Sequence, residues 1–168
     1  FYKYLTDVDQ MASIEEPKLA PPGTGLPKPE LFIARLIFAV QSRKGNRDTY
    51  NTRFTEERQI IRQLVDSCDP ASAATRVLIR RVPGLEDSSR YWSIWMTLDH
   101  LRIVNHGIAT TSEPLAQELA PSHKASTAAV KPRPAVDASI RNAYEISCDA
   151  VLAAVSAAPD LKTTARFA

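Results

Sequence analysis

Apolar side chains recur at intervals of three and four residues in three long stretches of the chain, at about 55–68, 89–109 and 135–157. This spacing places them on one face of an α-helix and predicts three amphipathic helices. In the first and last stretches the apolar set is Ile60, Ile61, Leu64, Val65, Ile140, Tyr144, Ile146, Val151, Leu152 and Val155. The side chains expected to share one core are Trp95, Leu98, Ile103, Ile61, Leu64, Tyr144 and Leu152. No stretch alternates convincingly as a strand does, so the predicted fold class is all-α.

Capping residues and prolines set the expected ends of these helices. Thr55 is the expected N-cap of the first long helix, because Glu56 and Glu57 follow in the first turn, where the helix dipole favours acids. Pro114 suits a first turn better than a helix interior. We therefore expect the second long helix to end near Ala109 and a separate short helix to run to Leu119.

Shorter elements fill the rest of the chain. A helix at about 30–41 ends at a loop of residues 44–48, and Asp69-Pro70 opens a short helix through Ala74. Residues 76–81 fit either a helix or an extended segment. Residues 1–29 contain five prolines and little periodicity, which predicts an extended arm. The expected organisation is this arm, 1–29, followed by one helical-bundle domain, 30–168, in which 121–134 form a loop.

Charge and cysteine content exclude some kinds of partner and compartment for this protein. The 21 basic and 19 acidic side chains nearly balance, which argues against a nucleic-acid partner, since such a partner needs a clustered basic face. Cys68 and Cys148 have no metal-ligand spacing and are too few for a disulfide framework, so a reducing compartment, the cytoplasm, is expected. Nucleotide-binding loops and nucleophile-elbow motifs are absent from the sequence.

The apolar run at 30–41 is too short to cross a bilayer and is interrupted by Arg35, so no transmembrane segment is expected. Two interpretations remain for this run. A helix on the membrane surface would have its basic end at Arg43 and Lys44. A short helix docked on the protein core is the simpler interpretation, and we favour it.

One histidine is the main candidate for a functional residue. Projected on a helix, Ser93, Thr97, His100 and Val104 fall on one stripe of a largely apolar segment. Imidazole is the commonest metal ligand, so His100 is a candidate metal ligand, although a hydrogen-bonded core histidine fits the same pattern. His106 is about 120° away on the helix and cannot share an ion with it.

Other titratable groups fit structural roles better than catalytic ones. His123 lies in a loop and is expected to be exposed. Asp99 should pair with Arg102 or His106 on its own helix face. Glu145 and Asp149, one turn apart, are expected to form a solvated pair, and Trp92 and Trp95 to pack in the core.

The order of the helices and the segment from Trp92 to Asn105, with Asp99-His100-Leu101 inside it, resemble the DinB-like superfamily of metalloenzymes. Residues 163–168 resemble the connector between the third and fourth helices of that family. The resemblance covers about residues 54–168 and implies an up-down-down-up four-helix bundle with an N-terminal extension. The fourth helix, with its HxxxH pair, is missing from these 168 residues, so we expect the protein to continue past Ala168.

The resemblance also implies a function. A divalent metal, zinc or nickel, would sit between His100 and the HxxxH pair of the complete protein, and residues 1–168 alone should hold none tightly. The substrate would be a thiol or a small hydrolysable molecule, as in the thiol S-transferases of the family. The alternative is a metal-free bundle that serves as a binding or oligomerisation module. In either case the unfilled inner faces of three helices predict a homodimer.

Overall fold

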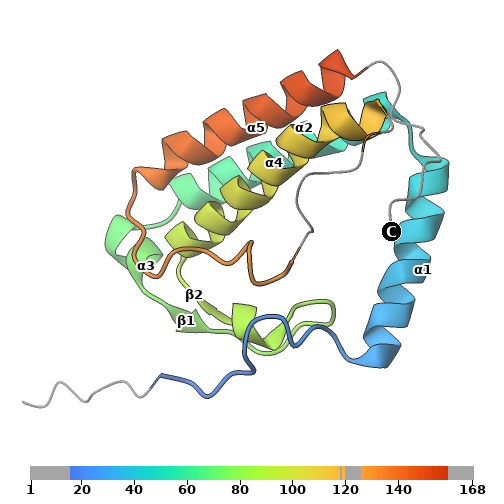
Figure 1. The fold of residues 1–168 in the computed structure, drawn as a ribbon. Coiled ribbons are helices and arrows are strands. Elements are labelled where there is room, and N and C mark those ends of the chain that lie inside the picture. Colours follow the sequence, from blue (N-terminus) through green and yellow to red (C-terminus); the bar gives the residue numbers. More distant parts are fainter. Residues whose placement is uncertain (1–15, 118, 120–125, 159–168) are drawn as a thin grey trace, which may run out of the picture.

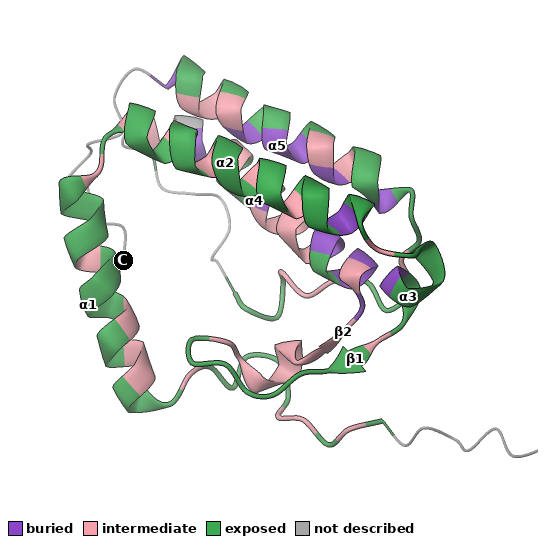
Figure 2. Cartoon of the chain, turned by 180° about the vertical axis from the view of Figure 1, so that it is seen from behind, coloured by how far each residue is buried: buried purple, intermediate pink, exposed green. Residues whose placement is uncertain are grey.

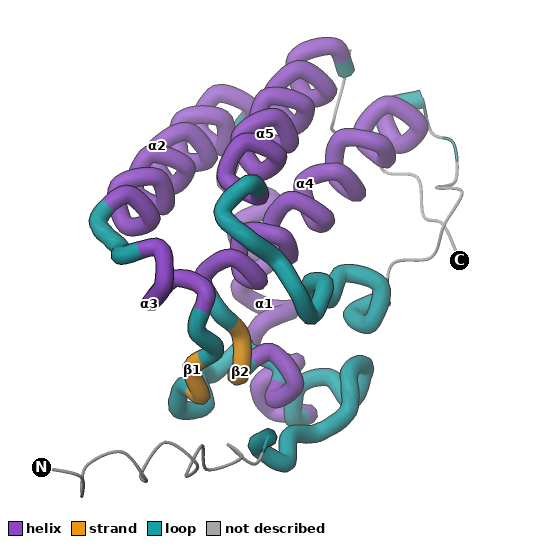
Figure 3. Tube along the Cα trace, turned by 90° about the vertical axis from the view of Figure 1, so that its left-hand side faces the viewer, coloured by secondary structure: helices purple, strands orange, loops and turns teal. Residues whose placement is uncertain are grey.

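Three long helices lie side by side and make the body of the molecule (Figure 1). They are α2 (Arg47–Asp66), α4 (Ile94–Ala116) and α5 (Ile140–Ala157). The computed structural model describes residues 16–117, 119 and 126–158. Within these residues the fold is all-α, as predicted, and a closed four-helix bundle is not present. Figure 3 shows α5 running along both α2 and α4.

The smaller elements lie at one end of this body. Helix α3 (Pro70–Ala74) follows α2, and a single-turn 3₁₀ helix covers Asp87–Ser89. Strand β1 (Val77–Leu78) pairs antiparallel with β2 (Tyr91–Trp92), with Val77 opposite Trp92. Of the two alternatives for residues 76–81, the extended one is therefore correct. The 16–27 part of the predicted arm has no helix or strand and runs past the 3₁₀ turn, where the Ala20 amide donates to Asp87 at 2.8 Å.

The core lies where α4 meets α5, with one face of α2 against it (Figure 2). Trp95, Leu98 and Tyr144 are buried there as predicted, and Ile61 packs against them. Ile103 and Leu152 are only half-buried. The prediction for Leu64 is wrong, because its side chain is 61% exposed.

The error at Leu64 follows from how little of α2 faces the core. The residues of α2 that reach it are Phe54, Ile61 and Val65, which form a single stripe at helical spacing. Leu64 and Ile60 lie beside this stripe and are exposed, and Ile146 is exposed in the same way on α5. The apolar periodicity predicted these helices correctly. The apolar arc of each helix is, however, wider than the face that packs against the core.

The start of α2 differs from the prediction. Its N-cap is Asn46, whose side chain accepts a hydrogen bond from the Thr49 amide at 2.8 Å. Thr55 lies inside the helix, where its hydroxyl donates to the Asn51 carbonyl at 2.9 Å. The predicted loop at 44–48 is therefore reduced to Gly45 and Asn46. A Cβ at Gly45 would overlap the Tyr50 ring, so a larger residue at this tight corner would displace that ring.

Helix α4 begins and ends later than predicted. It starts after Ser93, whose hydroxyl caps it by accepting from the Met96 amide at 3.2 Å, and the predicted helical residues Tyr91 and Trp92 form β2 instead. Residues 114–116 continue α4, and the described residues 117 and 119 form no separate helix. Pro114 lies in the last turn of α4, where a missing N–H removes only one intrahelical bond.

Helix α5 also begins later than predicted, at Ile140 rather than near Ala135. The residues before it form a turn, in which the Ile140 amide donates to the Asp137 carbonyl at 3.2 Å. Asp137 also accepts from the Ser139 amide through its side chain, at 2.9 Å. These local bonds hold the chain outside the helix until Ile140.

Helix α1 (Lys28–Lys44) stands apart from the body (Figure 1). It has no buried residue, and Phe32 and Phe38 are 70% and 75% exposed. The prediction that this segment docks on the core is therefore wrong. The apolar side chains of α1 that are even half-buried are Leu31, Ala34 and Ala39, and the others are exposed. None of the described helices combines the length and apolar character needed to cross a bilayer.

Candidate functional site

His100 lies on α4, half-buried under the loop of residues 126–139. Its Nδ1 is 2.5 Å from the carbonyl oxygen of Val130, and its ring lies against the Trp92 indole with centroids 5.1 Å apart. A carbonyl only accepts hydrogen bonds, so Nδ1 is the nitrogen that carries the proton. The lone pair of the neutral ring is then on Nε2.

The predicted polar stripe does not gather around His100. Ser93 is occupied as the cap of α4, and the Thr97 hydroxyl donates to the Ser93 carbonyl at 3.0 Å. Both side chains are thus satisfied by the backbone of the helix start. Of the stripe, His100 is the one residue whose side chain carries a nitrogen ligand for a metal.

A buried carboxylate holds the loop against α4 beside His100. Asp99 is 0% exposed and accepts from the Arg133 amide at 2.9 Å, from Arg133 Nε at 3.2 Å and from Arg102 Nε at 3.0 Å. Burial alone would raise the pKa of Asp99, but these hydrogen bonds outweigh burial and lower it. The predicted pairing with Arg102 is confirmed. The partner that sequence reasoning missed is Arg133, because it lies 34 residues away.

A second polar cluster joins the same loop to the arm and the 3₁₀ turn. Lys131 Nζ donates to Glu86, Ser88 and Ser89, each at 2.7 Å, and lies 5.3 Å from the centre of the Trp92 ring. The ammonium group is thereby fixed over the indole that borders His100. Sequence reasoning missed this cluster, because no local spacing connects Lys131 with the turn.

Glu86 also fastens the arm. Its carboxylate accepts from the amides of Gly23 and Gly25 at 2.8 and 3.0 Å. These glycines have φ values of 90° and 77°, which residues with a Cβ rarely adopt. Burial would raise the pKa of Glu86, but the hydrogen bonds from Lys131, both glycine amides and Ser88 lower it to about 2.

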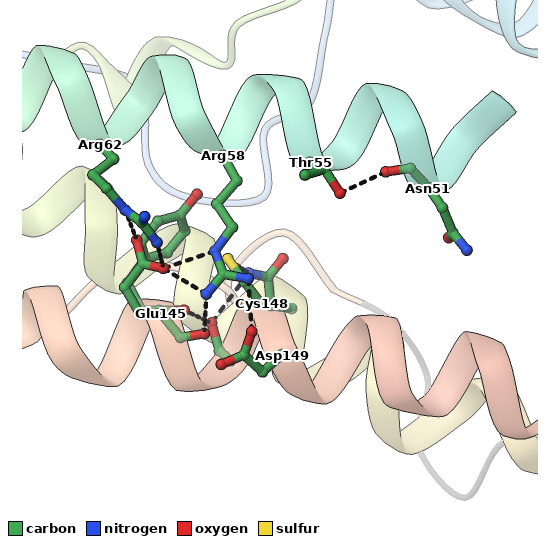
Figure 4. Close-up of polar contacts among 10 residues, drawn as sticks. Asn51, Thr55, Arg58, Arg62, Glu145, Cys148 and Asp149 are labelled. Carbon is green, nitrogen blue, oxygen red and sulfur yellow. Dashed lines mark hydrogen bonds and ion pairs between the residues drawn. The ribbon is translucent and has the colours of Figure 1, made fainter. Parts of the chain in front are cut away.

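Ion pairs also join α2 to α5 (Figure 4). Arg58 lies 2.5 Å from Glu145 and 2.6 Å from Asp149, and Arg62 lies 2.6 Å from Glu145. Arg141 and Asp66 form another ion pair between the same helices. The prediction that Glu145 and Asp149 form a solvated pair is wrong, since both face arginines of a helix more than 80 residues away.

The cysteines do not form a reactive centre in the described residues. Cys148 is fully buried, and its sulfur accepts from Asn105 at 3.4 Å. Burial raises the pKa of this thiol, which keeps it protonated and unreactive. Cys68 is free and half-buried.

The residues that the structure describes do not complete a metal site. Among them, no group of three or more His, Cys, Asp or Glu side chains could hold an ion. His106 is exposed on α4, away from His100 as expected. His123 and the predicted connector at 163–168 lie outside the described residues. His100 fits one ligand of a metal site, and the described residues do not complete the set of three around it.

Comparison with known proteins does not identify a family. No protein-family model matches the chain, and neither the curated proteins nor the solved structures give a match. The DinB-like resemblance therefore stays a hypothesis that rests on the segment around His100 and on the order of the helices.

Proposed function

We propose that this chain is part of a DinB-like, metal-dependent bundle protein in which His100 is one metal ligand. The observation that carries the proposal is the hydrogen bond from His100 Nδ1 to Val130. Metal-binding histidines commonly donate one ring N–H to a backbone carbonyl, which fixes the tautomer and turns the other nitrogen to the metal. The ligands that complete the site would come from outside the described residues.

The substrate class follows from the resemblance alone. A thiol or a small hydrolysable molecule fits a metal with an open coordination position, because such a metal stabilises a thiolate or a hydroxide. The two free cysteines are compatible with the reducing compartment in which a thiol cosubstrate is available.

Metal analysis of the full-length protein tests this proposal. We expect His100→Ala to lower metal affinity at least about tenfold, because one ligand is lost. His106→Ala is the matched control: it removes an exposed histidine from the same helix and should leave metal content unchanged. A full-length protein without metal, or one whose metal survives His100→Ala, would show that the proposal is wrong.

A second function, self-association, is favoured by a separate observation. Ile60 and Leu64 lie one turn apart on α2 and are 49% and 61% exposed. An apolar pair beside the only core-facing stripe of α2 is typical of a surface that another chain covers. Sedimentation equilibrium should then give a dimer, and Leu64→Glu should give a monomer. Gln63→Glu adds the same charge at a neighbouring exposed position and should leave the dimer intact.

A further inference from the structure

The outward face of α1 is apolar along its whole length. Projected at about 100° per residue, the five side chains of this face fall within an arc of about 140°. They are Phe32, Ile33, Leu36, Ile37 and Val40, and each is at least 40% exposed. On the opposite side of the helix, Glu30, Leu31 and Ala34 are half-buried, whereas Phe38 is 75% exposed. Soluble monomers seldom leave contiguous apolar patches larger than a few hundred Å² exposed, so this face indicates a binding surface.

The charges around this face are almost all positive. Lys28 and Arg35 border it, and Arg43 and Lys44 follow at its C-terminal end. Within the described residues, none of these four cations has a hydrogen bond or an ion pair with a side chain. The one acid of α1, Glu30, is neutralised by Arg81 at 2.7 Å and also accepts from the Gly84 amide at 3.2 Å.

This charge distribution favours one occupant over a second copy of the helix. In an antiparallel pair of α1 helices, Lys28 would meet Arg43 and Lys44, and in a parallel pair each cation would meet itself. Either arrangement places like charges together without an acid to separate them. An anionic surface meets the same cations with favourable charge and accepts the apolar side chains between them.

The helix is also held in a fixed position at both ends. Glu30 ties its first turn to Arg81 and Gly84, and at the other end the Tyr50 hydroxyl donates to the Gln41 carbonyl at 2.5 Å. Figure 1 shows α1 on one side of the molecule, away from the three packed helices. The apolar face is thus presented outward by a folded helix.

We propose that α1 binds peripherally to an anionic lipid bilayer. The helix lies in the plane of the interface, with its five apolar side chains at the acyl boundary and its four cations among the headgroups. It does not span the bilayer, since it has only 17 residues and four of them are basic. This proposal is independent of the metal site on α4.

Vesicle cosedimentation of the full chain tests it. Phosphatidylcholine vesicles are compared with vesicles in which about a third of the lipid is phosphatidylserine. We expect binding to the phosphatidylserine vesicles only, weakened by salt. The double variant Ile33→Glu, Leu36→Glu should lower the binding at least about tenfold, because it places charges in the apolar face.

Two further variants separate apolar from electrostatic contributions. Gln41→Glu with Ser42→Glu makes the same charge change on the opposite side of α1 and should lower the binding less than the face variant. Arg43→Gln should lower it about fivefold, as expected for one cation near an anionic surface. All of these positions are exposed, so circular dichroism should show an unchanged fold.

Three results would overturn the proposal. The first is a wild-type protein that does not bind phosphatidylserine vesicles. The second is equal loss of binding in the face variant and in the charge-matched control. The third is a wild-type protein that is an oligomer and does not bind vesicles, together with a face variant that is a monomer. That result would make this face a protein interface.

Discussion

At the scale of single residues, Asp99 determines how the loop before α5 sits on α4. It is fully buried, while its partners Arg102 and Arg133 remain partly exposed. A buried carboxylate without partners would be strongly unfavourable, so folding must bring Arg133 to it. The same contact places Val130, three residues earlier, where its carbonyl meets His100.

We predict that Asp99→Asn lowers the free energy of unfolding by about 2–3 kcal/mol, because hydrogen bonds to a charged group are replaced by weaker ones. Urea denaturation measures this. Asp149→Asn removes a carboxylate that is 68% exposed and should lower the free energy of unfolding by under about 1 kcal/mol. Equal effects of the two variants would contradict the role assigned to burial.

The effect of Asp99 should depend on pH in a defined direction. Its pKa is lowered from the ordinary 3.8 in the folded chain, so folding favours the charged form. The stabilisation is complete above the unfolded pKa and is lost as pH falls through the lower folded value. The difference between wild type and Asp99→Asn should thus be constant above about pH 5 and shrink below it. A difference that grows in acid would contradict this assignment.

We predict that acid releases the arm from Glu86. The pKa of Glu86 is about 2 in the folded chain, against an ordinary 4.5. Its hydrogen bonds from the Gly23 and Gly25 amides therefore stabilise the fold fully above pH 4.5, and this stabilisation is lost as the pH falls to about 2. Protection of these two amides from hydrogen exchange should fall over that window. In Glu86→Gln the protection should be low throughout and independent of pH, and a variant that keeps the wild-type profile would exclude Glu86 as the cause.

At the scale of elements, the sequence predicts which helices form and misses where they begin. Apolar periodicity located α2, α4 and α5 because it extends over many residues. Their first residues depend on competition between nearby caps, and Asn46 begins α2 nine residues before Thr55. The i to i+3 pair Asp99–Arg102 was predictable from helix geometry, whereas contacts such as Arg133 with Asp99 depend on the folded path of the chain.

The α2–α5 contact leads to a prediction at the same scale. Arg58 is nearly buried and reaches two carboxylates, while Arg62 is 46% exposed and reaches one. We expect Arg58→Met to lower the free energy of unfolding by about 2 kcal/mol and Arg62→Met to lower it clearly less. Methionine keeps the apolar stem in both variants, so the comparison isolates the charge. Similar losses would mean that the two arginines share the contact equally.

At the scale of the whole molecule, the helices are held by different means. Helices α4 and α5 share most of the buried side chains and an internal polar link, Asn105 to Ser147 at 3.1 Å. Helix α2 contributes one apolar stripe and is otherwise held by ion pairs near the surface. Helix α1 contributes no buried residue. Local stability should therefore decrease from the α4–α5 pair to α2 and then to α1.

Native-state hydrogen exchange of the full chain tests this order. Amides of α4 and α5 should exchange only with global unfolding, because opening them exposes the core that includes Trp95 and Tyr144. Amides of α2 should open at a lower free energy. High salt, which screens the ion pairs, or Arg58→Met, which removes two of them, should lower this opening free energy further. The opening free energies of α4 and α5 should change less. Amides of α1 should be the least protected, and phosphatidylserine vesicles should raise their protection selectively if α1 binds the bilayer. If the α2 amides exchanged together with those of α4 and α5 in both the wild type and Arg58→Met, the three helices would be one cooperative unit. The ion pairs would then not be what attaches α2.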